Sequence, residues 1–180
     1  MIDLDLSNIE KKNILITGGA GFIGSNLVRF FAERKIRVSV IDNLSTGDIK
    51  NIEPYLDYVF FLKSDICDFN KLEKAFRGIV PDIVFHMAAM PGVANSVTDP
   101  CTSNDVNLSV FLNVLKLSHE YNTSRVVLSS SSSVYGGAAT LPTPETYIGQ
   151  PKSPYALQKA TCEEYCRLFS KLYNVDTVSL

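Results

Sequence analysis

Asn13–Leu27, NILITGGAGFIGSNL, is the stretch that decides the fold. Four residues with β-propensity, Ile14–Thr17, run directly into three glycines at a three-residue interval, Gly18, Gly21 and Gly24. A helical pattern follows, and this order of strand, glycine turn and helix is the one that a dinucleotide-binding loop requires. The first glycine permits a tight turn, the second lets backbone amides approach a pyrophosphate, and the third lets the helix pack closely on the strand. The free N–H groups and the dipole of the helix start favour the phosphate charge.

Strands and helices alternate along the rest of the chain. The helix after the glycine loop is expected over residues 22–31, with an apolar face formed by Phe22, Ile23, Leu27, Val28 and Phe31. Further strands are expected at residues 37–42, 58–62, 82–86, 126–129 and 175–180, and further helices at 69–76, 103–121 and from 154 onward. This alternation predicts an α/β fold with a doubly wound parallel sheet of the Rossmann type, in one domain of 180 residues.

The composition excludes several classes of protein. The chain is 46% hydrophobic and 20% charged, with a net charge of −2 and no basic block, so nothing indicates a nucleic-acid or membrane-surface partner. No apolar run approaches the ~18 residues of a transmembrane helix, and the acidic N-terminus does not resemble a signal peptide, so we expect a cytoplasmic protein. The four cysteines are interpreted as free thiols, because the two histidines lie in other elements and complete no metal site.

The second predicted strand ends in an acidic residue, Asp42, eighteen residues after Gly24. A carboxylate at this place can accept hydrogen bonds from the ribose hydroxyls of adenosine. Asp42 can also be a turn residue, since Asp–Asn pairs favour turns. The glycine loop favours the ribose role. Because a carboxylate repels a 2′-phosphate and Asn43 brings no cation, we predict NAD rather than NADP.

Polar or small residues follow the other predicted strands. Asp65, after the third strand, is placed to reach an adenine, although Asp65 or Asp68 can equally cap the next helix. The fourth strand leads into His86–Met90, whose small residues let a ligand approach the backbone. The loops after the first and fourth strands flank the switch point of a doubly wound sheet, where the cofactor is expected to lie.

Five serines, Ser129–Ser133, stand at the carboxyl edge of the fifth strand, and a helix with a Ser153 cap follows. Tyr155 and Lys159 share one face of that helix. They can be a surface pair or a general base with its cationic partner. An ammonium ~4 Å from a phenolate, at an effective dielectric of ~20, stabilises it by ~4 kcal/mol, which favours a base near neutral pH. Asn107, inside a helix, is by default a structural residue that is exposed or locally bonded.

Together these stretches resemble the extended short-chain dehydrogenase/reductases of the NAD-dependent epimerase/dehydratase family, and most of all the UDP-sugar 4-epimerases. The matching stretches, in the family's order over nearly the whole chain, are TGGAGFIGSNL, DNLSTG, SDICDF, HMAAMPGV, SSSSSVYGG and SPYALQKA.

The resemblance implies roles for individual residues. Those expected to hold NAD, besides the three glycines, are the amides of Phe22 and Ile23 at the pyrophosphate, Asp42 and Asn43 at the adenosine ribose, Asp65 and Ile66 at the adenine, and Ala88, Ala89 and Met90 along the cofactor. Those expected at the reaction centre are Tyr155 as the base, Lys159 as its partner and anchor of the nicotinamide ribose, Ser131 as the hydroxyl that bonds the reacting oxygen, and Asn107 near them. Asn107, Tyr155 and Lys159 are also expected to contact the cofactor.

The implied reaction is epimerisation at the 4-position of a UDP-hexose through transient oxidation to a 4-keto sugar. Sugar-nucleotide 4,6-dehydratases carry an Asp–Glu pair just before Val-Tyr-Gly, and the related decarboxylases typically carry a glutamate there. Here these positions are Ser132 and Ser133. Two alternatives stay open: another dehydrogenase, reductase or dehydratase of this type, and a catalytically idle NAD-binding domain.

The resemblance also implies what surrounds the domain. Residues 175–180 are expected to be the sixth strand, and in the family the chain continues from there into a nucleotide-sugar domain. We therefore expect residues 1–180 to be the NAD-binding portion, without most of the uridine-nucleotide pocket and inactive alone. A homodimer through the helices at residues 103–121 and 154–173 is expected by the same analogy.

Overall fold

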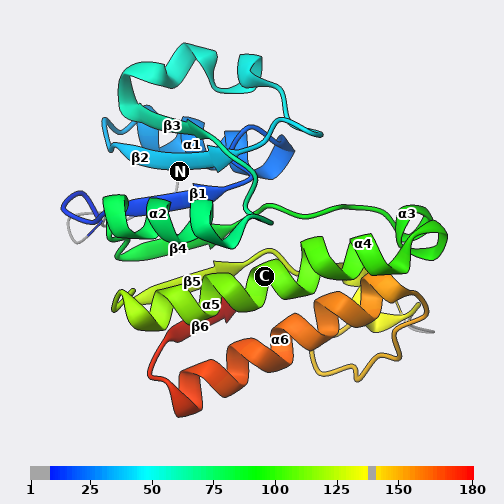
Figure 1. Cartoon of the computed structure of the whole chain (residues 1–180). Helices are drawn as coiled ribbons and strands as arrows, with labels where there is room; N and C mark the ends of the chain where they lie inside the picture. Colours follow the sequence, from blue (N-terminus) through cyan, green and yellow to red (C-terminus); the bar gives the residue numbers. More distant parts are fainter. Residues whose placement is uncertain (1–8, 138–140) are drawn as a thin grey trace.

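The computed structural model describes residues 9–137 and 141–180. Six parallel strands form one sheet in the order β3-β2-β1-β4-β5-β6 (Figure 1). Their bounds are β1 Ile14–Thr17, β2 Val38–Asp42, β3 Val59–Lys63, β4 Ile83–His86, β5 Arg125–Leu128 and β6 Asp176–Ser179. The order reverses between β1 and β4, which confirms the predicted doubly wound sheet.

Helices cover both faces of the sheet. Their bounds are α1 Phe22–Ala32, α2 Phe69–Ile79, α3 Val93–Thr98, α4 Pro100–Asn104, α5 Val110–Glu120 and α6 Pro154–Leu172. α2, α5 and α6 lie in front of the sheet in Figure 1 and form one apolar cluster with it, while α1 packs against the other face and forms a second cluster. No helix within residues 9–137 and 141–180 is long and apolar enough to span a membrane.

The predicted apolar face of α1 is wrong in its first turn. Val28 and Phe31 are buried as expected, but Phe22 is 86% exposed and Ile23 is 53% exposed. The helix begins just beyond the carboxyl edge of the sheet, so its first turn has no strand residues to pack against. Hydrophobicity alone did not reveal that these two positions face the solvent.

The helix predicted at residues 103–121 is longer and irregular. It begins with α4 at Pro100, where Asp99 caps the first turn, and a π-helical turn, Asp105–Ser109, joins α4 to α5. Asp99–Pro100 is a recognisable start signal, whereas the π turn has no local sequence signature. The short α3 was not predicted either.

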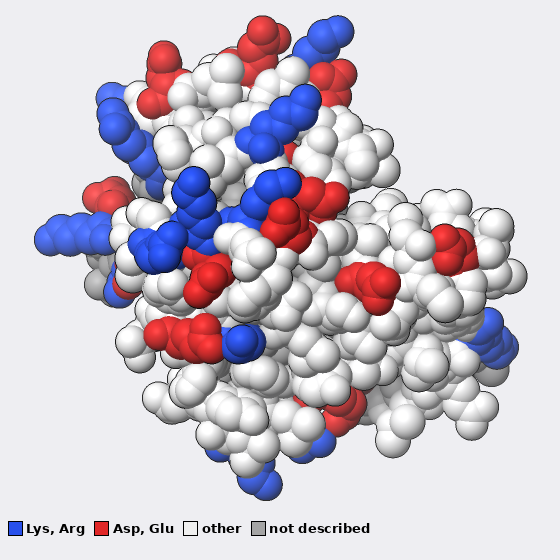
Figure 2. All heavy atoms as spheres, viewed as in Figure 1, with Lys and Arg blue, Asp and Glu red and all other residues white. Residues whose placement is uncertain are grey.

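Charged residues of both signs gather over β1–β3 and α2 in the upper left of Figure 2, where Lys and Arg lie beside Asp and Glu. The surface over α4, α5 and α6 in the same view is mostly uncharged. The four cysteines are free, with Cys67 and Cys101 exposed and Cys162 and Cys166 buried, as interpreted from the sequence.

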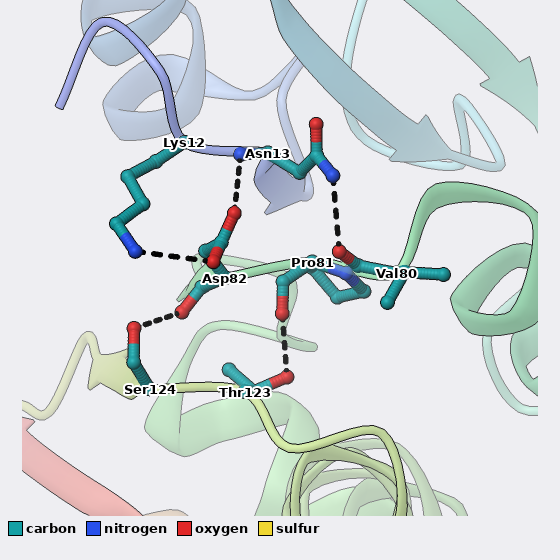
Figure 3. Close-up of polar contacts among 7 residues, drawn as sticks. All are labelled: Lys12, Asn13, Val80, Pro81, Asp82, Thr123 and Ser124. Atoms are coloured by element: carbon teal, nitrogen blue, oxygen red, sulfur yellow. Dashed lines mark hydrogen bonds and ion pairs between the residues drawn. The ribbon is translucent and has the colours of Figure 1, made fainter.

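Asp82 holds the amino-terminal edge of the sheet together (Figure 3). Its carboxylate accepts hydrogen bonds from the backbone N–H of Asn13 (2.8 Å) and from Lys12 Nζ (3.2 Å). Its carbonyl accepts one from Ser124 Oγ (2.7 Å). The starts of β1, β4 and β5 are therefore tied by one residue, opposite the edge where the glycine loop lies.

Ser118 of α5 carries a buried hydroxyl with no hydrogen-bond partner in the described part of the chain. Such a group costs about 1–3 kcal/mol, and alanine is also the better helix former. We expect Ser118→Ala to stabilise the fold by about 1 kcal/mol and to raise the unfolding midpoint by about 2–4 °C. In contrast, Ser103→Ala should lower the midpoint, because Ser103 Oγ donates to Gln158 Oε1 (2.9 Å). Thermal unfolding checks both, and a lower midpoint for Ser118→Ala would contradict the expectation.

Candidate functional site

The glycine loop between β1 and α1 approaches other backbone so closely that side chains are excluded. Gly18 has φ +69°, and a Cβ there would lie 2.6 Å from the amide nitrogen of Ala88. A Cβ on Gly24 would lie 2.2 Å from the carbonyl oxygen of Gly18. Gly21 is less crowded, with Gly18 O at 3.3 Å from the same hypothetical atom. The first glycine therefore serves the tight turn, as predicted, and the third permits close packing of α1, although on the backbone of Gly18 and Gly19 rather than on the strand.

A pocket of about 440 Å³ opens between this loop and the segments after β2, β3 and β4. Nine residues predicted to hold the cofactor line it: Gly18, Gly21, Asp42, Asn43, Asp65, Ile66, Ala88, Ala89 and Met90. Ser45, Thr46 and Cys67 also line it, and although they lie in the stretches DNLSTG and SDICDF, no role was predicted for them. Val106, in the π turn, was missed because nothing in the local sequence marks that turn.

Phe22, Ile23 and Gly24 are not among the pocket-lining residues but form the first turn of α1 beside it. The cap residue, Gly21, has no side chain, and no side chain caps the helix start. The first backbone N–H groups of a helix have no intrahelical acceptor. The amides of this turn are therefore free to meet an anion at the pocket.

Asp42 fills the turn role that was one of the two interpretations made from the sequence, while its role at a ribose stays a prediction. Its Oδ1 accepts a hydrogen bond from the backbone N–H of Leu44 (2.8 Å), which is the turn role, and its Oδ2 accepts one from the N–H of Ala20 (2.9 Å) in the glycine loop. The side chain is buried but borders the pocket. A carboxylate has about four lone-pair sites, so it retains capacity for ribose hydroxyls.

The helix-capping alternative belongs to Asp68 rather than to Asp65. Asp68 accepts hydrogen bonds from the backbone N–H groups of Asn70 and Lys71 and begins α2. Asp65 accepts one from the backbone N–H of Cys67 (2.9 Å), and this bond lowers the pKa of the Asp65 carboxyl. Asp65 therefore presents an ionised carboxylate at the end of β3, where it lines the pocket.

His86, the last residue of β4, contacts the pocket wall indirectly through Thr17. Thr17 Oγ1 lies 2.9 Å from His86 Nδ1 and also accepts the backbone N–H of Ala88 (3.3 Å). Burial lowers the pKa of His86 to about 3, with a smaller effect from the charge of Lys159. The imidazole is therefore neutral near pH 7 and positions the segment after β4 rather than transferring protons.

Asn107 is neither exposed nor bonded only within its helix. It is buried, and Oδ1 accepts the backbone N–H of Met90 (2.8 Å). Its Nδ2 donates to Met90 O (3.2 Å) and to Gln158 Oε1 (2.9 Å). Its role is structural, as the default interpretation had it, but the expectation that it is exposed or only locally bonded was wrong because that expectation considered only the residue's own helix. Asn107 holds the pocket-lining Met90 and joins it to α6 through Gln158, which was not predicted.

α6 holds the serine run at two points. Lys159 is only 3% exposed, and its Nζ donates to the carbonyl of Ser129 (2.7 Å). One helical turn further on, Glu163 accepts a hydrogen bond from Ser130 Oγ. Burial lowers the pKa of the Lys159 ammonium. A solvated surface pair is therefore excluded for Lys159.

Ser131 and Tyr155 flank these contacts. Ser131 Oγ accepts hydrogen bonds from the backbone N–H (3.2 Å) and the hydroxyl (2.9 Å) of Ser133, which leaves its own hydrogen to donate. Tyr155 is half-buried in the first turn of α6, and its backbone N–H donates to Ser96 Oγ (3.0 Å). Ser131 therefore lies just beyond the carboxyl end of β5, and the backbone of Tyr155 is held at the start of α6 by Ser96 of α3.

Residues 14–180 match the NAD dependent epimerase/dehydratase family. The chain belongs to this family. Three solved structures of similar proteins each cover 93% of this chain. The Thermus thermophilus UDP-glucose 4-epimerase, in complex with NAD, has 37% identity and a TM-score of 0.86. The Thermotoga maritima UDP-glucose 4-epimerase with UDP-glucose has 37% identity and a TM-score of 0.87. The Methanobrevibacter ruminantium UDP-N-acetylglucosamine 4-epimerase with UDP-N-acetylmuramic acid has 38% identity and a TM-score of 0.85.

The match covers only part of these epimerases. This chain corresponds to 53%, 54% and 53% of the three structures, in the same order. It also spans about half the length of most of the curated relatives that it matches, for example 52% of the UDP-glucose 4-epimerase of Mycolicibacterium smegmatis.

Proposed function

We propose that this chain is the NAD-binding and catalytic portion of a UDP-hexose 4-epimerase. The observation that carries the proposal is the contact between Lys159 Nζ and Ser129 O, which fixes a buried cation at the carboxyl edge of the sheet. Tyr155 lies one helical turn before this cation, and Ser131 lies two residues after Ser129. The names of the similar solved structures support the same reaction.

The pocket fits a dinucleotide. Gly18 and Gly24 allow a tight loop, because a side chain at either position would overlap neighbouring backbone. The uncapped start of α1 offers amides for a pyrophosphate. Asp42 would hold the adenosine ribose, and Asp65 with Ile66 would border the adenine. Met90, held by Asn107, would line the remainder of the cofactor. NAD bound there would supply a reversible acceptor for the hydrogen at C4 of the sugar.

The side chains of this chain would manage the proton and the reacting oxygen. Tyr155, as the phenolate, would remove the proton of the 4-hydroxyl, and the Lys159 ammonium would stabilise the phenolate. Ser131 would donate its hydroxyl hydrogen to the reacting oxygen. After the 4-keto sugar has rotated within the site, C4 would be reduced on its other face. Tyr155 would then return the proton to the 4-oxygen, which gives the 4-epimer.

Ser132 and Ser133 favour epimerisation over elimination. The dehydratases that the sequence resembles carry two acidic residues at these positions, and elimination of water needs an acid and a base. Ser132 is exposed and Ser133 is bonded to Ser131, so neither supplies a carboxyl group. Oxidation and re-reduction at one carbon remain.

The similar epimerases are about twice as long as the region that this chain matches, and the additional length affects the activity expected of this chain. About half of each similar structure lies outside the region that this chain matches. We propose that a segment of that kind completes the uridine-nucleotide site. Binding energy from the remote part of a substrate orients the reacting part, so the 180-residue chain should bind NAD yet turn over UDP-sugars very slowly.

A homodimer is part of the proposal, through the mostly uncharged surface over α5 and α6 (Figure 2). Large apolar side chains are exposed on α6, with Leu157 at 59% and Leu172 at 63%. Exposed apolar residues of this kind are typical of contact surfaces between subunits.

Product analysis tests the reaction. A full-length protein that contains this chain, incubated with NAD and UDP-galactose or UDP-N-acetylglucosamine, should yield only the 4-epimer, as measured by nuclear magnetic resonance. Net reduced cofactor would instead indicate a dehydrogenase, and a 4-keto-6-deoxy sugar would indicate a dehydratase. Either product would overturn the epimerase assignment.

Cofactor choice tests the role of Asp42. Because its carboxylate lies at the pocket with no cation at Asn43, NAD should bind the 180-residue chain at least about tenfold more tightly than NADP, which corresponds to ~1.4 kcal/mol. Asp42→Ala should reduce this preference, while Asp68→Ala, which removes the α2 cap and an exposed ion pair with Lys71, should retain it. Calorimetry measures the affinities, and equal binding of the two cofactors by the unmodified chain would contradict the role.

A further inference from the structure

The segment after β2 packs directly on the glycine loop. The carbonyl oxygen of Ala20 accepts hydrogen bonds from Asn51 Nδ2 (2.8 Å) and from the backbone N–H of Asp48 (3.2 Å). A Cβ on Gly47 would lie 2.9 Å from the carbonyl carbon of Ala20, so this glycine permits the close approach. Ala20 itself is fully buried. Gly47, the last residue of the stretch DNLSTG, therefore lets this segment pack against the glycine loop at Ala20.

The contact with Asn51 fixes the orientation of one peptide group. The carbonyl of Ala20 and the N–H of Gly21 belong to the same planar unit. Gly21 N–H donates to Gly18 O (3.1 Å), and Asn51 and Asp48 hold the other end of the unit. Asp42 Oδ2 accepts the N–H of Ala20, which holds the preceding peptide group. The next N–H groups along the chain are the uncapped amides of α1.

Asn51 has a defined position but is not part of the pocket wall. It ends a short 3₁₀ turn, Ile49–Asn51, whose start is capped by Asp48 through Lys50 N–H (3.0 Å). The next residue, Ile52, is fully buried in the core on the α1 side of the sheet. Asn51 is not among the residues that line the pocket, and it is an exposed residue. The contact that links Asn51 to the glycine loop is its hydrogen bond to Ala20 O.

We infer that Asn51 is a positioning residue for the phosphate-binding loop. By donating to Ala20 O, it keeps the loop in the orientation that presents the α1 amides to a pyrophosphate. The inference rests on the proposed binding of NAD at this pocket. It assigns a function to a surface asparagine that is not among the pocket-lining residues.

Two substitutions separate the lost hydrogen bond from an added charge. Asn51→Ala removes the donor, and NAD should bind the 180-residue chain about fivefold more weakly, which corresponds to ~1 kcal/mol. Asn51→Asp keeps the shape but sets a carboxylate against Ala20 O, and binding should weaken more than about tenfold. Asn122→Asp is the matched control, because it adds the same charge at the opposite edge of the sheet, between α5 and β5. Its affinity for NAD should equal that of the unmodified chain.

Calorimetry with NAD, well below the unfolding midpoint of every variant, gives the result. Thermal unfolding of the same samples identifies a merely structural role, which would lower the midpoint and leave the affinity unchanged. Weaker binding by both Asn51 variants, with the control unaffected, supports the inference. Unchanged affinity in both variants overturns it while leaving the proposed function intact. If the unmodified chain does not bind NAD, the proposed function itself fails, and the inference fails with it.

Discussion

Gly24→Ala is expected to destabilise the chain by about 3 kcal/mol, or roughly 6–12 °C in the unfolding midpoint, and to abolish NAD binding. The added Cβ would lie 2.2 Å from the carbonyl oxygen of Gly18 and 2.7 Å from the Cα of Gly19. Both are backbone atoms, so no side-chain rotation relieves the overlap. The glycine loop would have to move away from α1, and the amides of the first turn would move with it.

Gly78→Ala is the matched control, and its expected effect on the free energy of unfolding has the opposite sign. Gly78 also lies in a helix, α2, but nothing lies within 4 Å of the Cβ position. Alanine there should stabilise the chain by about 0.5–1 kcal/mol through helix propensity alone, with NAD affinity unchanged. Thermal unfolding and calorimetry on the 180-residue chain measure both variants. A Gly24→Ala variant as stable as the unmodified chain would contradict the packing role.

Tyr155→Phe is expected to reduce kcat by about 10²–10⁴-fold, in a full-length protein that contains this chain, with NAD affinity nearly unchanged. The substitution removes only the hydroxyl group that would take the proton. The ring, the start of α6 and the bond from Tyr155 N–H to Ser96 are retained. Initial rates with UDP-galactose measure the effect, and calorimetry confirms that the cofactor still binds.

Tyr165→Phe is the control for this experiment. Tyr165 lies on α6 as well, three turns beyond Tyr155, and packs against the core. Its substitution should leave kcat within the range of the unmodified enzyme. If Tyr155→Phe retained most of the rate, the base would have to be another residue and the proposed mechanism would be wrong.

The elements that the sequence predicted are those with strong local signals. The glycine triplet after a β-branched strand gave β1, the loop and α1, and Ser153–Pro154 gave the start of α6. Periodicity failed where tertiary surroundings decide, as for Phe22 and Ile23, whose exposure depends on where the sheet ends. The π turn around Asn107 depends on packing against α6, where Cys162 Sγ donates to Asn107 O (3.4 Å). A local pattern does not contain that information.

The same distinction holds for the candidate site. Asp42 and Lys159 stood out because each residue type occurs at a spacing with a known chemical use. The residues that hold the glycine loop and Asn107 in place did not stand out, because their partners are far along the chain: Asn51 bonds Ala20, and Gln158 bonds Asn107. Support of this kind is a property of the folded chain. It became visible only when hydrogen bonds could be assigned between distant segments.

Retention of a label at C4 tests the central claim most directly. UDP-galactose carrying deuterium at C4 is incubated in ordinary water with NAD and a full-length protein that contains this chain. If the hydrogen leaves C4 and returns to the same carbon, UDP-glucose should form with its deuterium retained, as measured by mass spectrometry and nuclear magnetic resonance. Formation of UDP-glucose with the deuterium replaced by hydrogen from water would contradict transient oxidation at C4.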